Sequence, residues 1–193
     1  MTKTAIILAA GRGSRLDPGG QRHAFSKPLI SVGGQSLLSR TINNCRSAGC
    51  DRIIVVTGFN AELVSAEARR LSNGDVETVY NPDWRMKNGL SLYVCKDIVD
   101  TDFFLMMSDH VFDADTMRWM GREPLLPGSV TLAVDYKINT IFDMDDATKV
   151  VVENGRIADI GKQLTTFNAI DTGLFRCTPA IFDALGEARD ENG

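Results

Sequence analysis

Short apolar runs alternate with segments of helical periodicity through the first half of the chain. Three runs, at residues 4–9, 52–57 and 103–107, are mainly apolar, which is typical of strands covered on both faces. Residues 36–48 and 61–72 place apolar side chains three and four positions apart, as amphipathic helices do. This alternation implies right-handed crossovers, and it predicts an α/β fold with a mixed, mostly parallel sheet flanked by helices.

The second half of the chain is richer in strands and hairpins. Asn154-Gly155 lies between two apolar stretches and predicts a tight hairpin. The strands expected in this half cover residues 130–135, 149–153, 156–160 and 170–176. No repeat or low-complexity linker separates the two halves, so we expect a single domain over residues 1–193.

Composition and charge narrow the functional classes. The 193 residues carry a net charge of −4, which argues against a diffuse nucleic-acid footprint. No stretch approaches the roughly 20 apolar residues that span a bilayer, and the N-terminus lacks the basic flank and cleavage site of a secretion signal. The four cysteines include no CxxC pair, which disfavours a structural zinc site. We therefore expect a cytoplasmic protein with free thiols that contacts neither nucleic acid nor membrane.

The loop LAAGRGSRL, residues 8–16, follows the first strand and is rich in glycine and arginine. Ligands of open α/β sheets bind beyond the carboxyl ends of the strands, where this loop is expected to lie. Gly11 and Gly13 let backbone amides approach phosphate oxygens, and Arg15 can bind phosphate through two parallel hydrogen bonds. Leu16 excludes the dinucleotide fingerprint, and the phosphate-loop motif is absent as well. A glycine-rich turn with solvated arginines is the alternative interpretation.

A carboxylate follows the apolar strand at residues 103–107, in the sequence FFLMMSDH. Asp109 is therefore expected at the same edge of the sheet as the glycine loop. Mg²⁺ prefers oxygen ligands and usually binds through one or two carboxylates together with substrate phosphates. We predict that Asp109 is a metal ligand, with the capping of the next turn as the alternative. His110 is expected to be a hydrogen-bonding neighbour and receives no catalytic role.

The glycine loop followed by Lys27-Pro28-Leu29 strongly resembles the signature of the sugar-phosphate nucleotidyltransferases. The resemblance implies a glycosyltransferase-A-like fold in which this loop wraps the triphosphate of an incoming nucleotide. It also implies that Arg15 and Lys27 bind phosphates and stabilise the charge that develops in the reaction. In the resembled family the aspartate that matches Asp109 holds the metal. Arg15, Lys27 and Asp109 are accordingly the candidate catalytic residues, and Mg²⁺ is the implied cofactor.

The segment NPDWRMKNGLSLY begins at Asn81, and a short helix is expected to start near Ser91, which could cap it as could Asn88. The segment resembles the NP…N-x-x-S stretch of cytidylyltransferases, which helps to enclose the nucleotide. Thr57-Gly58-Phe59, at the end of the second strand, would lie near the base in that fold. The nucleotide-binding residues implied by the resemblance are Leu8, Ala9, Ala10, Gly11, Gly13, Ser14, Arg15, Lys27, Thr57, Asn88, Gly89 and Ser91.

Among nucleotidyltransferases, the chain most resembles the CTP:inositol-1-phosphate cytidylyltransferases. The segments that carry this resemblance are, in order, SDHVF, DATK, IGK and DTGLF. The resemblance implies that Lys149 and Lys162 meet the phosphate of the acceptor, although lysines are more often ordinary surface charges. Asp171 lies in an apolar strand, where a carboxylate is costly unless it is paired or functional, and we expect it to bind a polyol acceptor. These enzymes are often the N-terminal part of a bifunctional protein whose membrane-embedded part is a CDP-alcohol transferase.

The expected reaction is transfer of CMP from CTP to a small phosphorylated alcohol, with inositol 1-phosphate favoured and pyrophosphate released. Phosphocholine as acceptor, or a sugar 1-phosphate with UTP or dTTP, are alternatives within the same chemistry. A nucleotide-binding module without turnover is an alternative of another class, and a nicotinamide dehydrogenase is disfavoured by Leu16. The sequence leaves open whether the protein forms a homodimer.

One departure from the resembled family lies at the end of the chain, which reads GEARDENG. Family members continue beyond this point and supply a second metal-binding aspartate, for which this chain has no match. We therefore expect either a domain truncated at its C-terminus or an incomplete metal site. Residues 1–115 are the expected nucleotide-binding half, and residues 116–193 are the expected acceptor-binding half.

Overall fold

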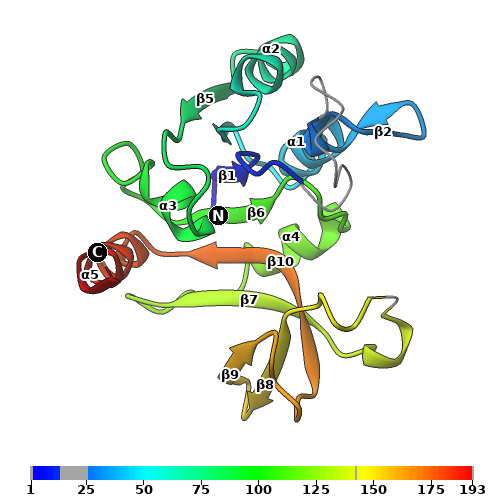
Figure 1. Ribbon diagram of the computed structural model, residues 1–193, viewed down its shortest axis with the longest axis vertical. Coiled ribbons are helices and arrows are strands. Elements are labelled where there is room, and N and C mark those ends of the chain that lie inside the picture. Colours follow the sequence, from blue (N-terminus) through cyan, green and yellow to red (C-terminus); the bar gives the residue numbers. More distant parts are fainter. Residues whose placement is uncertain (1, 14–25, 142, 193) are drawn as a thin grey trace.

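One central sheet organises the molecule, whose computed structural model describes residues 2–13, 26–141 and 143–192. Within these residues the sheet has eight strands in the order β5-β4-β1-β6-β10-β8-β9, and β7 pairs with β10 as well (Figure 1). The strands are β1 (Thr4–Leu8), β4 (Arg52–Thr57), β5 (Val76–Tyr80), β6 (Phe103–Met107), β7 (Val130–Asp135), β8 (Lys149–Glu153), β9 (Arg156–Gly161) and β10 (Ala169–Cys177). The predicted mixed sheet is confirmed.

The four strands of the first half, β5, β4, β1 and β6, are all parallel. Leu8, the last residue of β1, lies opposite Val56 on β4 and Met107 on β6. The carboxyl ends of β1 and β6 are therefore level. The backbone N–H of Ser108 donates to the carbonyl of Leu8 at 3.1 Å, which keeps the two chain segments together just past the strands. The register thus brings the glycine loop and Asp109 to one edge.

The second half joins the sheet through antiparallel strands. β10 pairs antiparallel with β6 through Leu174–Cys177 and with β8 through Ala169 and Ile170, and it also pairs antiparallel with β7. At Ile170, β7 and β8 lie on opposite sides of β10. β8 and β9 form the expected hairpin, and both turn residues have a positive φ, 50° at Asn154 and 73° at Gly155. Asparagine and glycine tolerate this conformation better than other residues, which is why the dipeptide predicted the turn.

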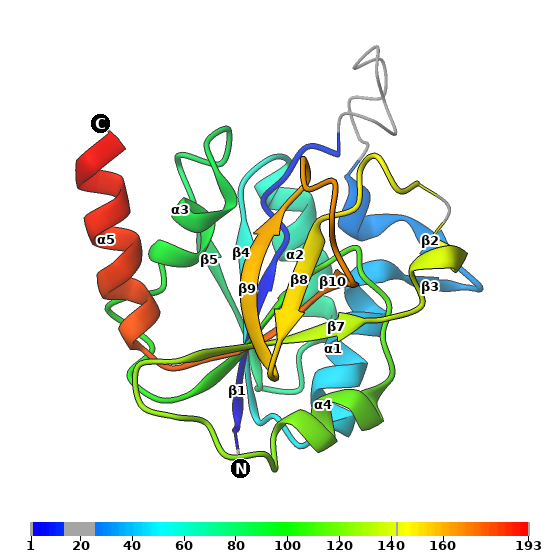
Figure 2. The same ribbon diagram turned by 90° about the horizontal axis from the view of Figure 1, so that it is seen from below.

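Helices cover both faces of the sheet, as Figure 2 shows for α1 and α4 on one side and α3 and α5 on the other. Alternate residues of β1 divide between two hydrophobic clusters. Ala5 and Ile7 pack with residues of α1, α2 and α4, whereas Ile6 and Leu8 pack with residues of α3 and α5. The helices are α1 (Leu37–Ser47), α2 (Ala61–Leu71), α3 (Asn88–Tyr93), α4 (Ala114–Met120) and α5 (Ala180–Asn192).

Three local features differ from the sequence prediction. α3 begins at Asn88, three residues before the expected start, and its N-cap is Lys87, without a side-chain cap. α4 was not predicted, because it has only seven residues; the Asp113 side chain caps it by accepting the N–H of Asp115 at 2.9 Å. The short hairpin of β2 (Ser31–Val32) and β3 (Gln35–Ser36) was not predicted either.

The four cysteines are free, as expected from the sequence, and the structure shows that all four are buried. Over the described parts of the chain, no helix has both the length and the apolar character that a bilayer span requires.

Candidate active site

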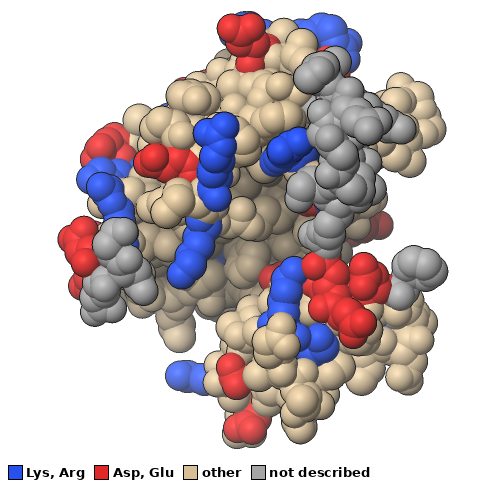
Figure 3. Space-filling view, viewed as in Figure 1, with Lys and Arg blue, Asp and Glu red and all other residues tan. Residues whose placement is uncertain are grey.

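A cavity of about 220 Å³ opens at the carboxyl edge of the parallel strands. Figure 3, which looks onto this edge, shows the surface hollowed between the part built on β1 and β4 and the part built on β8 and β9. The residues that line the cavity are Leu8, Ala10, Gly11, Gly13, Lys27, Pro28, Asn88, Ser91, Met107, Ser108 and Asp109. They come from four separate chain segments, which are brought together only when the chain folds.

The first segment is the glycine loop after β1. Its backbone follows the edge of β4, because the N–H of Ala9 donates to the carbonyl of Val56 and the N–H of Phe59 donates to the carbonyl of Ala10, both at 2.9 Å. Gly13 has a φ of +67°, and a Cβ atom there would lie 3.0 Å from the Cβ of Lys27. Both backbone conformation and space therefore favour glycine at this position.

The second segment carries Lys27, the first residue of the 3₁₀ helix η2 (Lys27–Leu29), and the third carries Asp109. The Lys27 ammonium forms an ion pair with Oδ2 of Asp109. Oδ1 of the same carboxylate is 2.9 Å from Nδ1 of His110. The Lys27 side chain is 30% exposed and the Asp109 side chain is 23% exposed, so both remain accessible from the cavity.

The Asp109 carboxyl is held in its charged form. Burial acts to raise its pKa, but the hydrogen bonds from His110 and Lys27 outweigh this effect and hold the pKa well below its usual range. The site therefore presents one cation and one anion side by side at neutral pH. The cation can bind a phosphate, and the anion can bind a hard divalent cation.

The donor set fits Mg²⁺ bound jointly with a substrate. Within the described residues no group of three His, Cys, Asp or Glu side chains is placed to hold a metal ion. A single ionised carboxylate, Asp109, faces the cavity next to Lys27. Mg²⁺ commonly takes one or two carboxylates and completes its coordination with phosphate oxygens and water. Asp109 can supply the protein's share of such a site.

The fourth segment runs from Asn81 into α3 and forms the far wall of the cavity. Asn88 and Ser91 line it. Asn81 is 1% exposed, and its amide Nδ2 donates to Oγ of Ser91 at 2.9 Å. Two aromatic rings, Phe59 and Trp84, join this segment to the end of β4, with ring centroids 5.3 Å apart.

Gly58, which precedes Phe59, brings three segments into contact. A Cβ atom at Gly58 would lie 2.4 Å from the Cβ of Trp84 and 2.9 Å from the Cβ of Ala10. The glycine loop, the end of β4 and the wall of the cavity therefore meet at a residue without a side chain. The resemblance placed Gly58 near the base, and a glycine directly after a buried strand is itself an indication of close approach.

Most of the predicted nucleotide residues meet at the cavity, whereas three described ones do not line it. Ala9 is buried in the core, and Thr57 is 1% exposed with its hydroxyl donating to the carbonyl of Val79 at 3.3 Å. Gly89 faces Leu185 of α5, whose Cδ2 would lie 2.9 Å from a Cβ at this position. Ser14 and Arg15 lie outside the described residues. Pro28, Met107 and Ser108 line the cavity but were not predicted.

Of the predicted acceptor residues, Lys149 lies on β8 and Asp171 on β10, and Lys162 directly follows β9. Lys149 is 8% exposed, and its ammonium donates to the backbone carbonyl of Lys162 at 2.7 Å. The Lys162 side chain is 48% exposed and forms an ion pair of 2.6 Å with Asp146. Lys149 therefore holds the end of β9 in place, and Lys162 carries the accessible charge.

Asp171 lies on β10 where the register with β7 shifts. Burial raises the pKa of its carboxyl, and Oδ1 accepts the N–H of Gly173 at 2.6 Å. Gly173 has a φ of +75°, and a Cβ there would lie 2.9 Å from Cγ of His110. The irregularity of β10 thus makes room for the imidazole that hydrogen-bonds Asp109, a link that no local sequence pattern predicts.

Replacing Gly173 by alanine is expected to lower the thermal midpoint by more than backbone strain alone explains. A left-handed alanine costs about 1–2 kcal/mol, and the new methyl group also displaces the His110 ring. Gly128 is the matched control, because its φ is +73° and a Cβ there meets nothing within 4 Å. In thermal unfolding we expect Gly173→Ala to melt about 4 °C below Gly128→Ala. Equal midpoints would show that His110 is not fixed by this contact.

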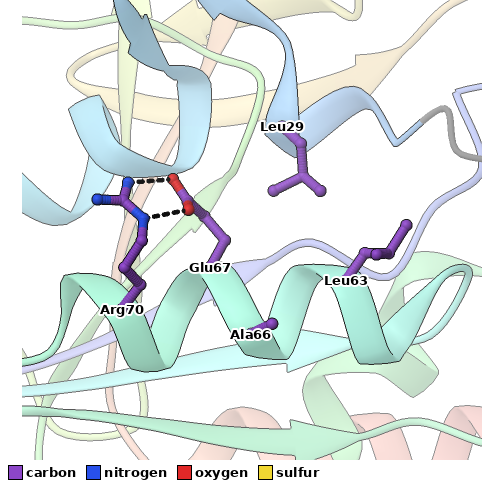
Figure 4. Close-up of a pocket in the computed structure, with 5 residues that line it drawn as sticks. All are labelled: Leu29, Leu63, Ala66, Glu67 and Arg70. Carbon is purple, nitrogen blue, oxygen red and sulfur yellow. Dashed lines mark hydrogen bonds and ion pairs between the residues drawn. The ribbon is translucent and has the colours of Figure 1, made fainter.

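Two further cavities lie away from the Lys27–Asp109 pair. One, of about 320 Å³, lies between α2 and η2, where Leu29 faces Leu63 and Ala66, and Arg70 makes a two-bond contact with Glu67 at 2.8 and 2.9 Å (Figure 4). The other, of about 430 Å³, is a groove between the segment before α3 and the C-terminal helix α5. It is lined by Asp83, Met86, Lys87, Gly89, Leu90, Leu185, Ala188 and Arg189.

The chain is similar in sequence to known proteins over nearly its whole length. The chain is 33% identical over 191 residues to the bifunctional IPC transferase and DIPP synthase of Aquifex aeolicus, covering 99% of this chain and 42% of the relative. It is 28% identical over 196 residues to the UTP–glucose-1-phosphate uridylyltransferase AglF of Haloferax volcanii, covering 97% of this chain and 77% of the relative. The chain thus spans about two fifths of the length of the bifunctional relative.

The fold is also that of a solved nucleotidyltransferase. The inositol-1-phosphate CTP transferase from T. maritima superposes with a TM-score of 0.83 at 23% sequence identity, covering 94% of this chain and 73% of that one. This match confirms the expected glycosyltransferase-A-like fold. The family model described as the MobA-like NTP transferase domain matches residues 5–136, a span that includes the glycine loop, Lys27, Ser91 and Asp109. The chain therefore belongs to the family of MobA-like NTP transferase domains.

Proposed function

We propose that this domain transfers CMP from CTP to a small phosphorylated alcohol, with inositol 1-phosphate as the favoured acceptor. The observation that carries the proposal is the Lys27–Asp109 pair at a cavity that the glycine loop also lines. Two similarities support the choice of nucleotide and acceptor: that to the IPC transferase and DIPP synthase of Aquifex aeolicus, which extends over 99% of this chain, and the shared fold with the inositol-1-phosphate CTP transferase from T. maritima.

The reaction requires no strong base. An oxygen of the acceptor's phosphate attacks the α-phosphorus of CTP, the bond from that phosphorus to the bridging oxygen of the β-phosphate breaks, and pyrophosphate leaves. A phosphate monoester is already an anionic nucleophile, so no proton has to be removed. The protein's task is to bring two anions together and to stabilise the charge of the transition state.

The residues of the cavity divide this task between them. The backbone amides around Gly11 and Gly13 and the Lys27 ammonium would hold the triphosphate, with Ser14 and Arg15 as predicted additions. Asp109 would hold Mg²⁺, which supplies further neutralisation of phosphate charge when it is bound. Leu8, Ala10, Asn88 and Ser91 would surround the nucleoside.

The acceptor would approach from the second half of the chain. Lys162 supplies a charge for the acceptor's phosphate, and Lys149 keeps the Lys162 backbone in place. The partly buried Asp171 carboxyl would bind a polyol hydroxyl. We further propose that the domain works in the cytoplasm and that its CDP-alcohol product passes to a CDP-alcohol transferase.

A second candidate is uridylyl transfer to a sugar 1-phosphate. The similarity to the uridylyltransferase AglF, which covers 77% of that protein, favours it. Both candidates use the same triphosphate site and differ in base and acceptor, so they can be separated only by the products formed.

The test is a matrix of nucleotides and acceptors. CTP, UTP, dTTP and ATP are each incubated with inositol 1-phosphate, phosphocholine or glucose 1-phosphate in the presence of Mg²⁺. Pyrophosphate release is measured, and the product is identified by mass spectrometry. We expect the fastest release from CTP with inositol 1-phosphate. Faster release from UTP with glucose 1-phosphate would establish the second candidate, and CTP binding without release from any pair would indicate a non-catalytic module.

A further inference from the structure

We propose that Asn81 is a positioning residue for nucleotide recognition. It fixes the direction of the Ser91 hydroxyl hydrogen, so that Ser91 donates a hydrogen bond to a pyrimidine or ribose oxygen of the bound nucleotide. This inference rests on the proposed function, because it concerns the same cavity and the same nucleotide.

Three hydrogen bonds fix the backbone and the side chain of Asn81. It directly follows β5, and its backbone N–H donates to the carbonyl of Thr57 at 2.8 Å, which extends the β4–β5 ladder by one step. Its side-chain Oδ1 accepts the backbone N–H of Asp83 at 2.9 Å, and Nδ2 donates to Oγ of Ser91 at 2.9 Å. The residue is 1% exposed, so its side chain cannot turn freely into solvent.

These contacts determine where the hydrogens lie. A backbone N–H can only donate, so the amide oxygen of Asn81 must face Asp83 and the amide NH₂ must face Ser91. The Ser91 oxygen therefore accepts from Asn81, and its own hydrogen points elsewhere. In the described part of the chain this hydroxyl has no acceptor for its hydrogen, although Ser91 is 5% exposed and lines the cavity. An acceptor atom of a ligand in the cavity would receive the hydrogen bond from this hydroxyl.

The position of Ser91 selects the uncharged part of the nucleotide. Lys27 enters the cavity from the α1–α2 side of the sheet, where Leu29 packs against the cluster of those helices. Ser91 enters from the opposite side, where Leu92 packs with residues of α5 (Figure 2). The Lys27 ammonium thus lies at the end of the cavity that suits the phosphates, whereas the neutral Asn88 and Ser91 lie at the other end. A neutral hydroxyl donor suits a keto or ribose oxygen there.

The test is Asn81→Asp, a change that keeps the shape of the side chain and removes its donor. Both carboxylate oxygens only accept, so the Ser91 hydrogen must turn toward residue 81 and is lost to the ligand. We expect the KM for CTP to rise about 3- to 10-fold, the effect of one neutral hydrogen bond, with kcat within about twofold. Inhibition by pyrophosphate is expected to stay unchanged, because pyrophosphate occupies only the phosphate end.

Ser91→Ala supplies the second variant and the double-mutant background. Alone it is expected to raise the KM for CTP by the same factor, and in its presence Asn81→Asp should add no further increase. The analogues 2-thio-CTP, 2′-deoxy-CTP and 3′-deoxy-CTP identify the accepting oxygen, because the penalty of one of them should vanish in Ser91→Ala. An effect of Asn81→Asp that persists in the Ser91→Ala background would overturn the proposal. Weaker inhibition of Asn81→Asp by pyrophosphate would also overturn the proposal. The same holds if the penalties of all three CTP analogues persist in Ser91→Ala.

Calorimetric titration of CTP separates this inference from the function on which it rests. If the wild-type protein does not bind CTP, the proposed function fails. If the wild-type protein binds CTP and both variants bind it equally well, the function stands and the role of Asn81 and Ser91 is refuted.

Discussion

Asp109→Asn is expected to lower kcat for pyrophosphate release by about a hundred- to a thousandfold. Asparagine keeps the shape of the side chain but removes the negative charge that would hold Mg²⁺ and that pairs with Lys27. Its amide oxygen binds a divalent cation more weakly than a carboxylate does. The expected loss therefore lies in the chemical step and in the Mg²⁺ concentration needed for half-maximal rate, measured by coupled pyrophosphate detection.

Asp51→Asn is the matched control for this variant. Asp51 pairs with Lys3 at 3.5 Å beside the amino-terminal ends of β1 and β4, at the opposite end of the strands from Asp109. The control should retain wild-type kcat and a wild-type response to Mg²⁺. Near-normal turnover of Asp109→Asn at ordinary Mg²⁺ concentrations would remove Asp109 from the metal site.

Lys27→Met should lower kcat/KM for CTP by about a hundredfold or more. Methionine keeps the apolar stem that packs next to Gly13 and removes the ammonium. The triphosphate then loses a charged donor, and the pKa of Asp109 rises because one of the hydrogen bonds that lower it is gone. Steady-state kinetics with CTP as the varied substrate measure the loss, and circular dichroism confirms that the fold is retained.

Lys3→Met is the corresponding control, since Lys3 is the partner of Asp51 at the far end of the strands. It removes the same charge from the protein without touching the cavity. If Lys3→Met and Lys27→Met lose kcat/KM equally, the effect is one of overall charge, and Lys27 has no local role at the phosphates.

Local patterns were sufficient to predict the parallel half of the fold and the position of Asp109 beside the glycine loop. Apolar strand runs and helical periodicity gave the order of the elements, and parallel strands necessarily end at one edge. That argument placed Asp109 beside the glycine loop, and the structure adds the direct contact between Asp109 and Lys27. The hairpin at Asn154-Gly155 was predictable because the turn depends on those two residues alone.

The remaining parts of the site depend on contacts between distant segments. Gly58 meets Trp84, Gly173 meets His110, and Lys149 meets the backbone of Lys162. None of these pairs shares a helical face or a strand period, so one sequence carries no local pattern that joins them. The helix α4 was missed for a different reason: seven residues are too few for a period to stand out.

The most direct test of the account is a crystal structure of this chain with CTP and Mg²⁺. We expect the triphosphate between the Gly11–Gly13 backbone and the Lys27 ammonium, the cation on Asp109, and the nucleoside against Ser91. Nucleotide bound instead in the groove between the α3 segment and α5, or in the cavity on α2, with the Lys27–Asp109 pair left intact, would contradict it.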